Sequence, residues 1–305
     1  RRADAAVAAS AVDGIDHVIH IAAIPSVPRS VKNPIASHRA NVDATILLLD
    51  AARQADVTRV VFASSSSVYG NSPTLPKHEK MPTSPLSPYA LQKLMGEQYM
   101  QLYFELYGLE TVSLRFFNVF GPRQDPSSPY SGVISLFTAA LSEERQPTVY
   151  GDGEQTRDFT YVSDVATGVI SAATASSVAG RAINLAPGGR VSLNRLFVTL
   201  KELIGASDDV EPLYTAPREG DVRDSQATTP WLEICWISTR RWSWRKDCGA
   251  PWIGTGPPRV EVYLGGIFGF TTRSVPSTRM TSTRSPCTMT TAFPPSTSSS
   301  FARHS

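Results

Sequence analysis

The apolar residues of the N-terminal part of the chain fall into two kinds of block. Short continuous apolar runs at 17–23, 58–64 and 111–117 are typical of strands that are buried on both faces of a sheet. Longer segments at about 34–55 and 87–107 predict helices. Strands that alternate with helices of this length indicate parallel βαβ units, so the sequence predicts a Rossmann-like, doubly wound α/β fold.

Shorter elements follow from Asn118 onward, where turn signals such as Gly121-Pro122 interrupt the pattern. Their expected positions are a helix near 132–145, a strand at 148–150, a helix after Asp164, a strand at 181–186 and a helix that Ser192 caps and that ends near Ile204. A further alanine-rich helix is expected within residues 1–14. The later short elements predict a small α+β lobe beside the main sheet.

The expected domains are therefore discontinuous in sequence. Residues 1–120 with 159–180 form the dinucleotide-binding domain, and residues 121–158 with 181–227 form the substrate lobe. No Gly-x-Gly-x-x-Gly or Gly-x-x-Gly-x-x-Gly precedes a helix in an N-terminal βα unit. We expect the chain to begin after the phosphate-binding turn of such a fold, and hence to bind NAD weakly or not at all.

Composition changes abruptly after Ala227. All five tryptophans and all three cysteines follow it, and charged residues number 20 basic and 24 acidic before it against 9 and 3 after it. Hydrophobic periodicity also ends there, and residues 228–305 are expected to be disordered or non-native. A natural low-complexity tail is one explanation. A shift of reading frame near Ala227 is favoured. Codons permitted for the residues from Thr228 onward, read in the shifted frame, can encode an amphipathic helix, a turn and a second helix.

The same features exclude several functions. The basic excess lies in the tail alone, so no nucleic-acid partner is expected. Residues 1–227 contain no cysteine, which excludes disulfides and cysteine metal sites there, and no metal is predicted. No apolar run is long enough to cross a bilayer and no signal peptide opens the chain, so no membrane partner and a cytoplasmic location are expected.

The first chemical motif is Tyr89-x-x-x-Lys93 at the start of a predicted helix. Residues four apart share a helix face, so the phenol and the ammonium point into one site. A free tyrosine titrates near roughly 10 and is a poor base at neutral pH. A nearby cation favours the phenolate, which suits a general base.

A cluster of four serines, residues 64–67, ends the preceding predicted strand and leads into Val68-Tyr69-Gly70. Ligands of doubly wound sheets bind at the carboxyl ends of the strands, where this cluster is expected. Tyr89 lies 24 residues beyond Ser65, at the next helix. The serines and the Tyr-x-x-x-Lys pair are therefore expected to share a site.

These motifs resemble those of the extended short-chain dehydrogenase/reductases, the NAD-dependent epimerase/dehydratase family. Three further segments match in the expected order: residues 114–122, 151–165 with the Thr156-Arg157-Asp158-Phe159 core, and 218–221. The resemblance runs from the first residues to about Ala227. It is closest to the UDP-N-acetylglucosamine and UDP-glucose 4-epimerases.

The resemblance implies roles for the catalytic and cofactor residues. Tyr89 would take the proton of the sugar 4-hydroxyl, and Lys93 would bind the nicotinamide ribose and lower the tyrosine pKa. Ser65 would hydrogen-bond the same sugar oxygen. Small side chains at Ala22 and Ala23 would allow NAD to approach the backbone, and Phe116 would also lie beside the cofactor.

It also implies the substrate contacts. Arg157 and Arg218 would bind the diphosphate, because a planar guanidinium meets phosphate oxygens in pairs. Asn118 would add a phosphate contact, Asp221 would bind the nucleotide ribose, and Ser66 would contact the sugar. The family resemblance further implies a homodimer formed through the two long helices.

Ser66 and Ser67 distinguish the branches of the family. The 4,6-dehydratases place Asp-Glu there, and the UDP-glucuronate decarboxylases keep a glutamate at the second position. A serine is no acid or base near neutral pH without activation, so epimerisation is favoured. Ser225 stands where glucose-restricted epimerases carry tyrosine, which leaves room for an N-acetyl group.

Three hypotheses follow. A UDP-sugar 4-epimerase acting on UDP-N-acetylglucosamine, UDP-glucose or both is favoured. An epimerase of UDP-glucuronate, or a reductase of another nucleotide sugar, is the alternative within the family. An inactive nucleotide-sugar-binding fragment is the alternative of a different class.

Overall fold

The computed structural model describes residues 4–127, 132–218 and 221–228. The segment predicted to be disordered or non-native lies outside the described residues, apart from its first residue, Thr228.

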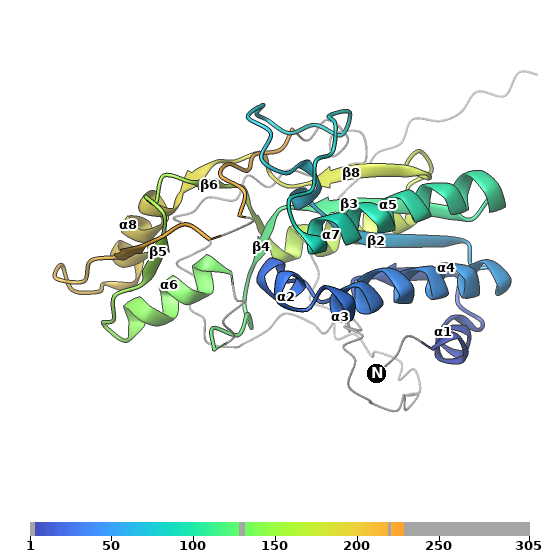
Figure 1. The fold of residues 1–305 in the computed structure, drawn as a ribbon, viewed down its shortest axis with the longest axis horizontal. Helices are drawn as coiled ribbons and strands as arrows, with labels where there is room; N and C mark the ends of the chain where they lie inside the picture. The colour runs from blue at the N-terminus through green and yellow to red at the C-terminus, as the bar shows by residue number, and fades with distance from the viewer. Residues whose placement is uncertain (1–3, 128–131, 219–220, 229–305) are drawn as a thin grey trace, which may run out of the picture. The chain divides into compact units, whose positions relative to one another are not determined.

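The central feature is a sheet of four parallel strands in the order β1 (His17–His20), β2 (Arg59–Ser65), β3 (Glu110–Phe116) and β8 (Arg181–Leu185). Parallel strands place their carboxyl ends at one edge, and the serines that end β2 lie there (Figure 1). The predicted parallel α/β architecture is confirmed.

Helices cover both faces of this sheet. Val60 and Phe62 of β2 pack with α1 (Ala5–Val12), α4 (Ala44–Gln54) and α5 (Pro88–Tyr107). Val61, which points the other way, packs with α7 (Val162–Thr174). This alternation explains why β2 reads as a continuous apolar run: each face of the strand has its own core.

The predicted helix at 34–55 is divided in three. The helix α3 (Pro34–His38) leads into a π-helical turn, η1 (Arg39–Asp43), and then into α4. A short helix, α2 (Val27–Lys32), precedes them, and Ser26 caps it. π-helical turns insert one residue into a helix and often mark functional positions.

Two sequence expectations need correction. The strand β1 was expected to be buried on both faces, but Ile19 is 43% exposed. Among the described strands, β1 pairs with β2 and with no other. The strand β8 was assigned to the substrate lobe, yet it pairs with β3 in the main sheet. Its buried residues Ile183 and Leu185 complete the core under α7, which a domain boundary drawn by sequence order does not reveal.

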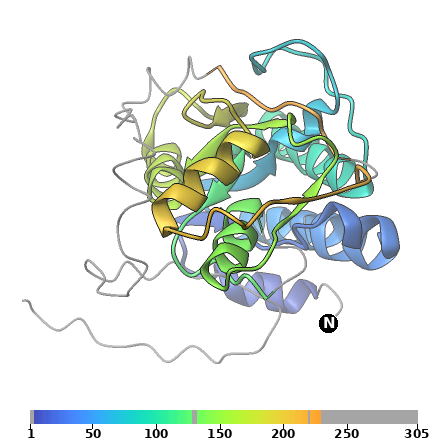
Figure 2. The ribbon, with the colours of Figure 1, turned by 90° about the vertical axis from the view of Figure 1, so that its left-hand side faces the viewer.

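Three pairs of short strands lie outside the main sheet among the described residues. These are β4 (Asn118–Phe120) with β7 (Phe159–Tyr161), β5 (Thr148–Tyr150) with β10 (Leu213–Thr215), and β6 (Thr156–Arg157) with β9 (Val191–Ser192). The helices α6 (Val133–Ser142) and α8 (Leu193–Ile204) pack on each other (Figures 1 and 2). Their residues Phe137 and Phe197 lie edge to face. Ser192 caps α8 as predicted, its hydroxyl accepting from the Arg195 amide at 3.2 Å.

No helix within the described ranges combines the length and the apolar character that a membrane crossing requires.

Candidate functional site

Ser65 and Tyr89 meet where β2 ends and α5 begins. Ser65 is the last residue of β2 and caps the 3₁₀ helix η2 (Ser66–Tyr69). Ser87 caps α5, its hydroxyl accepting from the Ala90 amide at 3.2 Å, so Tyr89 lies in the first turn. Ser65 lies near enough to the Tyr89 hydroxyl to lower the pKa of Tyr89 and so favour its phenolate. The structure therefore joins these two predicted catalytic side chains.

Lys93 lies one turn further along α5 and is buried, at 3% exposure. Its Nζ donates to the Ala63 carbonyl at 2.6 Å and lies 4.7 Å from the centre of the Phe62 ring. Gly96 brings the helix this close to β2, because a Cβ there would lie 2.5 Å from the Phe62 ring. Burial lowers the pKa of Lys93 to about 8, and Glu97 one turn away opposes that shift.

The pKa of Tyr89 differs from the sequence expectation. Burial raises the pKa of Tyr89 above its ordinary value, and the neighbouring Ser65 opposes the rise. Lys93 was expected to lower this pKa, but its ammonium is bonded to the Ala63 carbonyl. In the structure it is Ser65 that favours the phenolate.

Sequence reasoning missed a buried polar cluster that holds the start of α5. Gln92 Oε1 accepts from the Ser37 hydroxyl at 2.7 Å and from Asn41 Nδ2 at 2.9 Å. Asn41, in the π-helical turn, also accepts from the Ile24 amide at 2.7 Å. The cluster ties the Tyr89 helix to the segment that follows β1. An asparagine inside an apolar helix was the available signal.

The predicted cofactor residues surround the same edge of the sheet. Ala22 and Ala23 directly follow β1, with Ala22 exposed and Ala23 half-buried, and Phe116 ends β3 and is half-buried. His20, at the end of β1, hydrogen-bonds the Thr45 hydroxyl at 2.8 Å. Burial, and secondarily Lys93, lower the pKa of His20 to about 4, so it is neutral near pH 7.

A buried ion pair lies beside the end of β2. Arg115 of β3 donates from Nη2 and Nε to the two carboxylate oxygens of Glu97 at 2.7 and 2.9 Å. The Ser64 hydroxyl also bonds Glu97, and Arg115 Nη1 donates to the Tyr69 hydroxyl at 2.9 Å. Tyr69 in turn donates to Asn184 of β8 at 2.7 Å. This network joins α5, the ends of β2 and β3, η2 and β8.

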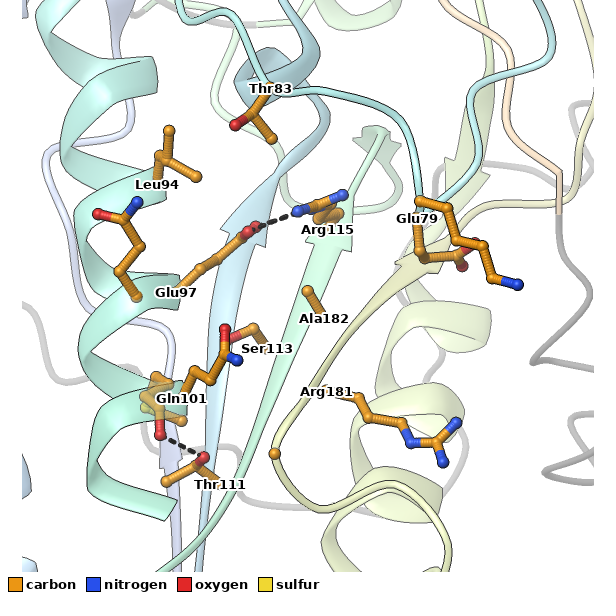
Figure 3. Close-up of a pocket in the computed structure, with 14 residues that line it drawn as sticks. Glu79, Thr83, Leu94, Glu97, Gln101, Thr111, Ser113, Arg115, Arg181 and Ala182 are labelled. Atoms are coloured by element: carbon orange, nitrogen blue, oxygen red, sulfur yellow. Dashed lines mark hydrogen bonds and ion pairs between the residues drawn. The ribbon is translucent and has the colours of Figure 1, made fainter. Parts of the chain in front are cut away.

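The ion pair also lines a cavity of about 440 Å³ beside α5. Figure 3 shows Glu97 and Arg115 pointing toward each other above Ser113 and Ala182. The residues around the cavity come from α5, β3, β8 and the segment 79–83, and none of them is a predicted site residue. Because no predicted site residue lines the cavity, we assign the chemistry to Ser65 and Tyr89 instead.

The predicted diphosphate and ribose residues form a second group. Arg157 Nη2 donates to Asp221 Oδ2 at 3.2 Å, and the Asp221 amide donates to the Arg218 carbonyl at 3.4 Å. The Arg218 guanidinium lies 3.7 Å from the centre of the Tyr150 ring. Asn118 is anchored by two bonds to the backbone oxygen of Asp158, the neighbour of Arg157. Four predicted substrate residues are thus brought together.

Residues 221–228 connect this group to the loop that follows η2. The Arg223 amide donates to Asn71 Oδ1 at 3.2 Å, and the Lys77 amide donates to the Gln226 carbonyl at 2.7 Å. Within this segment Ser225 is buried, at 7% exposure, and its hydroxyl has no hydrogen-bond partner among the described residues. Ser66, the first residue of η2, is half-buried.

Asp158 is the buried centre of that connection. Its Oδ2 accepts from the Ala227 amide at 3.0 Å, and the amides of Gly188 and Gly189 also stabilise the carboxylate. Burial outweighs these bonds and raises the pKa of Asp158 to about 7. Sequence reasoning quoted Asp158 in a motif but gave it no role.

The raised pKa predicts a pH-dependent stability. A carboxyl that binds its proton more tightly when folded stabilises the fold fully below its unfolded pKa of 3.8, and this contribution is lost as the pH rises through about 7. The unfolding free energy of the wild type, relative to D158N, is expected to fall between pH 4 and pH 7 by on the order of a few kcal/mol. Urea denaturation across this range measures it.

The matched control is D209N, the same change at an exposed carboxylate. We expect D209N to follow the wild type at every pH. Parallel curves for the wild type and D158N would contradict the raised pKa.

Comparison with known proteins identifies the family. A model of the NAD dependent epimerase/dehydratase family matches residues 1–186. The chain belongs to this family. Membership confirms the resemblance inferred from the motifs, and family members use NAD.

Individual relatives are more specific. A putative UDP-glucose 4-epimerase from Methanocaldococcus jannaschii is 43% identical over 194 residues, which cover 63% of this chain and 62% of that protein. The UDP-N-acetylglucosamine 4-epimerase from Methanobrevibacter ruminantium M1, in complex with UDP-N-acetylmuramic acid, is 39% identical with a TM-score of 0.72, over 75% of this chain and 73% of the other. The UDP-glucose 4-epimerase from Thermus thermophilus, in complex with NAD, is 32% identical with a TM-score of 0.70, over 78% and 77%.

This family member thus spans less than two thirds of the length of the curated relative from Methanocaldococcus jannaschii.

Proposed function

We propose that this epimerase-family chain inverts C4 of a UDP-sugar, UDP-N-acetylglucosamine or UDP-glucose or both, with NAD as cofactor and through a 4-keto intermediate. The observation that carries the proposal is the placement of Ser65 at the end of β2 beside Tyr89 in the first turn of α5, with Lys93 buried one helical turn away. A phenol beside a hydroxyl at the carboxyl edge of a parallel sheet is suited to removing a proton from a sugar hydroxyl.

In this mechanism the Tyr89 oxygen accepts the proton of the sugar 4-hydroxyl. The Ser65 hydroxyl hydrogen-bonds the same 4-oxygen of the sugar and so holds it beside the Tyr89 oxygen. The chemistry that bound NAD would supply is reversible hydride transfer at C4, together with a positive charge that favours the Tyr89 phenolate. Tyr89 then gives its proton back to the 4-oxygen of the inverted sugar.

The residues present fit such a cofactor. Ala22 and Ala23 offer small side chains at the carboxyl end of β1, where a larger side chain would obstruct a flat ring. Lys93 offers a buried ammonium near Tyr89, suited to a ribose hydroxyl. Phe116 ends the strand after next in the sheet and would border the same cofactor.

The nucleotide end of the substrate is assigned to the second group of residues. Arg157 and Arg218 supply the positive charge for a diphosphate, Asp221 accepts from a ribose hydroxyl, and Asn118 adds a donor. Arg157 is suited to this role because its side chain is only 12% exposed and Asp221 already orients it.

The choice of reaction rests on the residues after Ser65. Ser66 and Ser67 lack the carboxylate that a dehydration or decarboxylation would use, so inversion at C4 is the chemistry these residues support. The N-acetyl preference rests on Ser225, a small, buried side chain whose hydroxyl has no partner among the described residues.

Product analysis by ¹H NMR tests the proposal. The chain is incubated at millimolar NAD with UDP-N-acetylglucosamine, UDP-glucose or UDP-glucuronate. We expect the anomeric signal of the 4-epimer from one or both of the first two. Product from UDP-glucuronate alone would favour the alternative epimerase. Saturable UDP-sugar binding without product from any of the three would favour the non-catalytic fragment.

A homodimer through the long helices is part of the proposal. Leu91, Leu102 and Leu106 of α5 are 48%, 45% and 67% exposed, which leaves an apolar stripe on the outer side of this helix. Sedimentation velocity distinguishes the dimer from a monomer.

A further inference from the structure

The ring of Phe62, on β2, packs against the turn of α5 that carries Lys93. The ring is buried, at 1% exposure, and the Lys93 Nζ lies over it, 4.7 Å from the ring centre. Gly96 lets the helix come this close, since a Cβ there would lie 2.5 Å from the ring. On β1, the ring centre of His20 lies 5.6 Å from that of Phe62. The Phe62 ring is therefore held in place against the helix.

A buried ammonium has to be stabilised by its surroundings, because burial favours the neutral amine. Lys93 is 3% exposed, and the acceptor that its Nζ meets among the described residues is the Ala63 carbonyl, at 2.6 Å. An ammonium has three N–H donors, so this bond uses only one of them. The face of an aromatic ring attracts a cation within about 6 Å of its centre, most strongly where water is excluded. The Phe62 ring meets both conditions.

The nearest charged groups do not contact the ammonium directly. Glu97, one turn further along α5, raises the pKa of Lys93 through its charge, but both of its carboxylate oxygens are bonded to Arg115 of β3. His20 is neutral near pH 7, because burial lowers its pKa to about 4. Neither group replaces the ring as a neighbour of the charge.

The other titratable groups around α5 are neutral, paired or turned to solvent. Tyr89, one turn before Lys93, is a neutral phenol near pH 7, because burial raises its pKa. Tyr69 of η2 is bonded to Arg115. The charged and titratable residues of α2, α3, η1 and α4 are exposed or half-buried: Arg29, Lys32, His38, Arg39, Asp43, Asp50 and Arg53.

We propose that Phe62 is a positioning residue whose ring face holds Lys93 as a charged ammonium, one helical turn from Tyr89 and with N–H donors left for the ribose of a cofactor. A ring suits this task better than a carboxylate. A carboxylate would accept the N–H donors and cancel the positive charge, whereas a ring attracts the ammonium and leaves its charge in place. The ribose contact rests on the proposed function, and the contact between ring and ammonium does not.

Fluorinated phenylalanines test the contact while they keep the shape of the core. Fluorine withdraws electron density from the ring face and so weakens its attraction for a cation. Nonsense suppression places 4-fluorophenylalanine or 3,4,5-trifluorophenylalanine at position 62 of the full chain. Position 137 is the matched control, because Phe137 is also 1% exposed and its ring packs on another ring, that of Phe197.

The first readout is the titration of Lys93. The chain is labelled with [ε-¹³C]lysine, and the Lys93 resonance is identified by its absence in K93R. A neighbour that favours the charged form raises a pKa, so weakening that neighbour lowers it. From about 8 in the wild type, we expect the pKa of Lys93 to fall with each step of fluorination at position 62, by about one pH unit with three fluorines. Fluorination at position 137 is expected to leave it in place. Coincident Lys93 titrations across the position-62 series would overturn the proposal, even if the chain is an active epimerase.

The second readout is the pH profile of kcat/KM for the UDP-sugar. Because the proposed function uses Lys93 in its charged form, we expect the alkaline limb of this profile to move to lower pH together with the Lys93 titration. An alkaline limb that stays in place while the titration moves would contradict the positioning role. A displaced titration in a chain that forms no epimer would support the contact between ring and ammonium and contradict the proposed function.

Discussion

Replacing Tyr89 by phenylalanine is expected to lower the rate of epimer formation by about 10²- to 10⁴-fold, the contribution of a positioned general base. The change removes one oxygen and leaves the ring in place at the start of α5. Because the diphosphate residues Arg157 and Asp221 are untouched, UDP-sugar affinity is expected to stay within about twofold of the wild type, since no hydrogen bond to the nucleotide is lost. The rate falls while ground-state binding is preserved.

Initial rates by NMR and UDP-sugar titration by calorimetry measure the two quantities. Y107F is the matched control, because Tyr107 ends the same helix with a ring that is 53% exposed. Removing its hydroxyl is expected to change neither quantity. Retention of the wild-type rate in Y89F would show that another group removes the proton.

Replacing Glu97 by glutamine is expected to destabilise the fold strongly, by about 3–5 kcal/mol in the free energy of unfolding. Both side chains of the Glu97–Arg115 pair are 6% exposed. Removing one charge leaves the guanidinium of Arg115 buried without its counter-ion, and glutamine offers one acceptor oxygen where Glu97 offers two to Ser64 and Arg115. The cost comes from the uncompensated charge and not from the lost bond alone.

Two controls distinguish burial from pairing. E143Q breaks an ion pair with Arg145 in which the side chains are 61% and 60% exposed, so less than about 1 kcal/mol is expected. The double variant E97L/R115M removes both buried charges and is expected to regain most of the stability lost in E97Q. Urea denaturation measures all four proteins. Equal losses for E97Q and E143Q would contradict the account of the buried network.

Local patterns in the sequence were enough to predict the parallel sheet and the Tyr89 helix. Apolar runs locate β2 and β3, and Ser192 caps α8 where expected, because strand burial and capping are local properties. The pairing of Ser65 with Tyr89 also follows from topology, since the ends of parallel strands share one edge.

Other features depend on contacts between distant residues. The hydrogen bond from Asn41 to Gln92 joins residues 51 positions apart, and the local sequence around Asn41 does not identify Gln92 as its partner. The position of the Lys93 ammonium depends on how closely Gly96 lets α5 approach Phe62. The membership of β8 in the main sheet depends on pairing with β3 across two intervening helices.

The segment 221–228 has a mechanical consequence. At one end of the segment, Asp221 accepts a hydrogen bond from Arg157. Near the other end, the Gln226 carbonyl accepts from the amide of Lys77, seven residues beyond Gly70, which ends η2. The segment therefore couples two properties. In the proposed function these are the affinity for the nucleotide at Arg157 and Asp221 and the rigidity of η2 with the loop that follows it. If Arg157 and Asp221 bind the nucleotide as proposed, UDP alone would stiffen the loop that follows η2, because coupling between two sites is reciprocal.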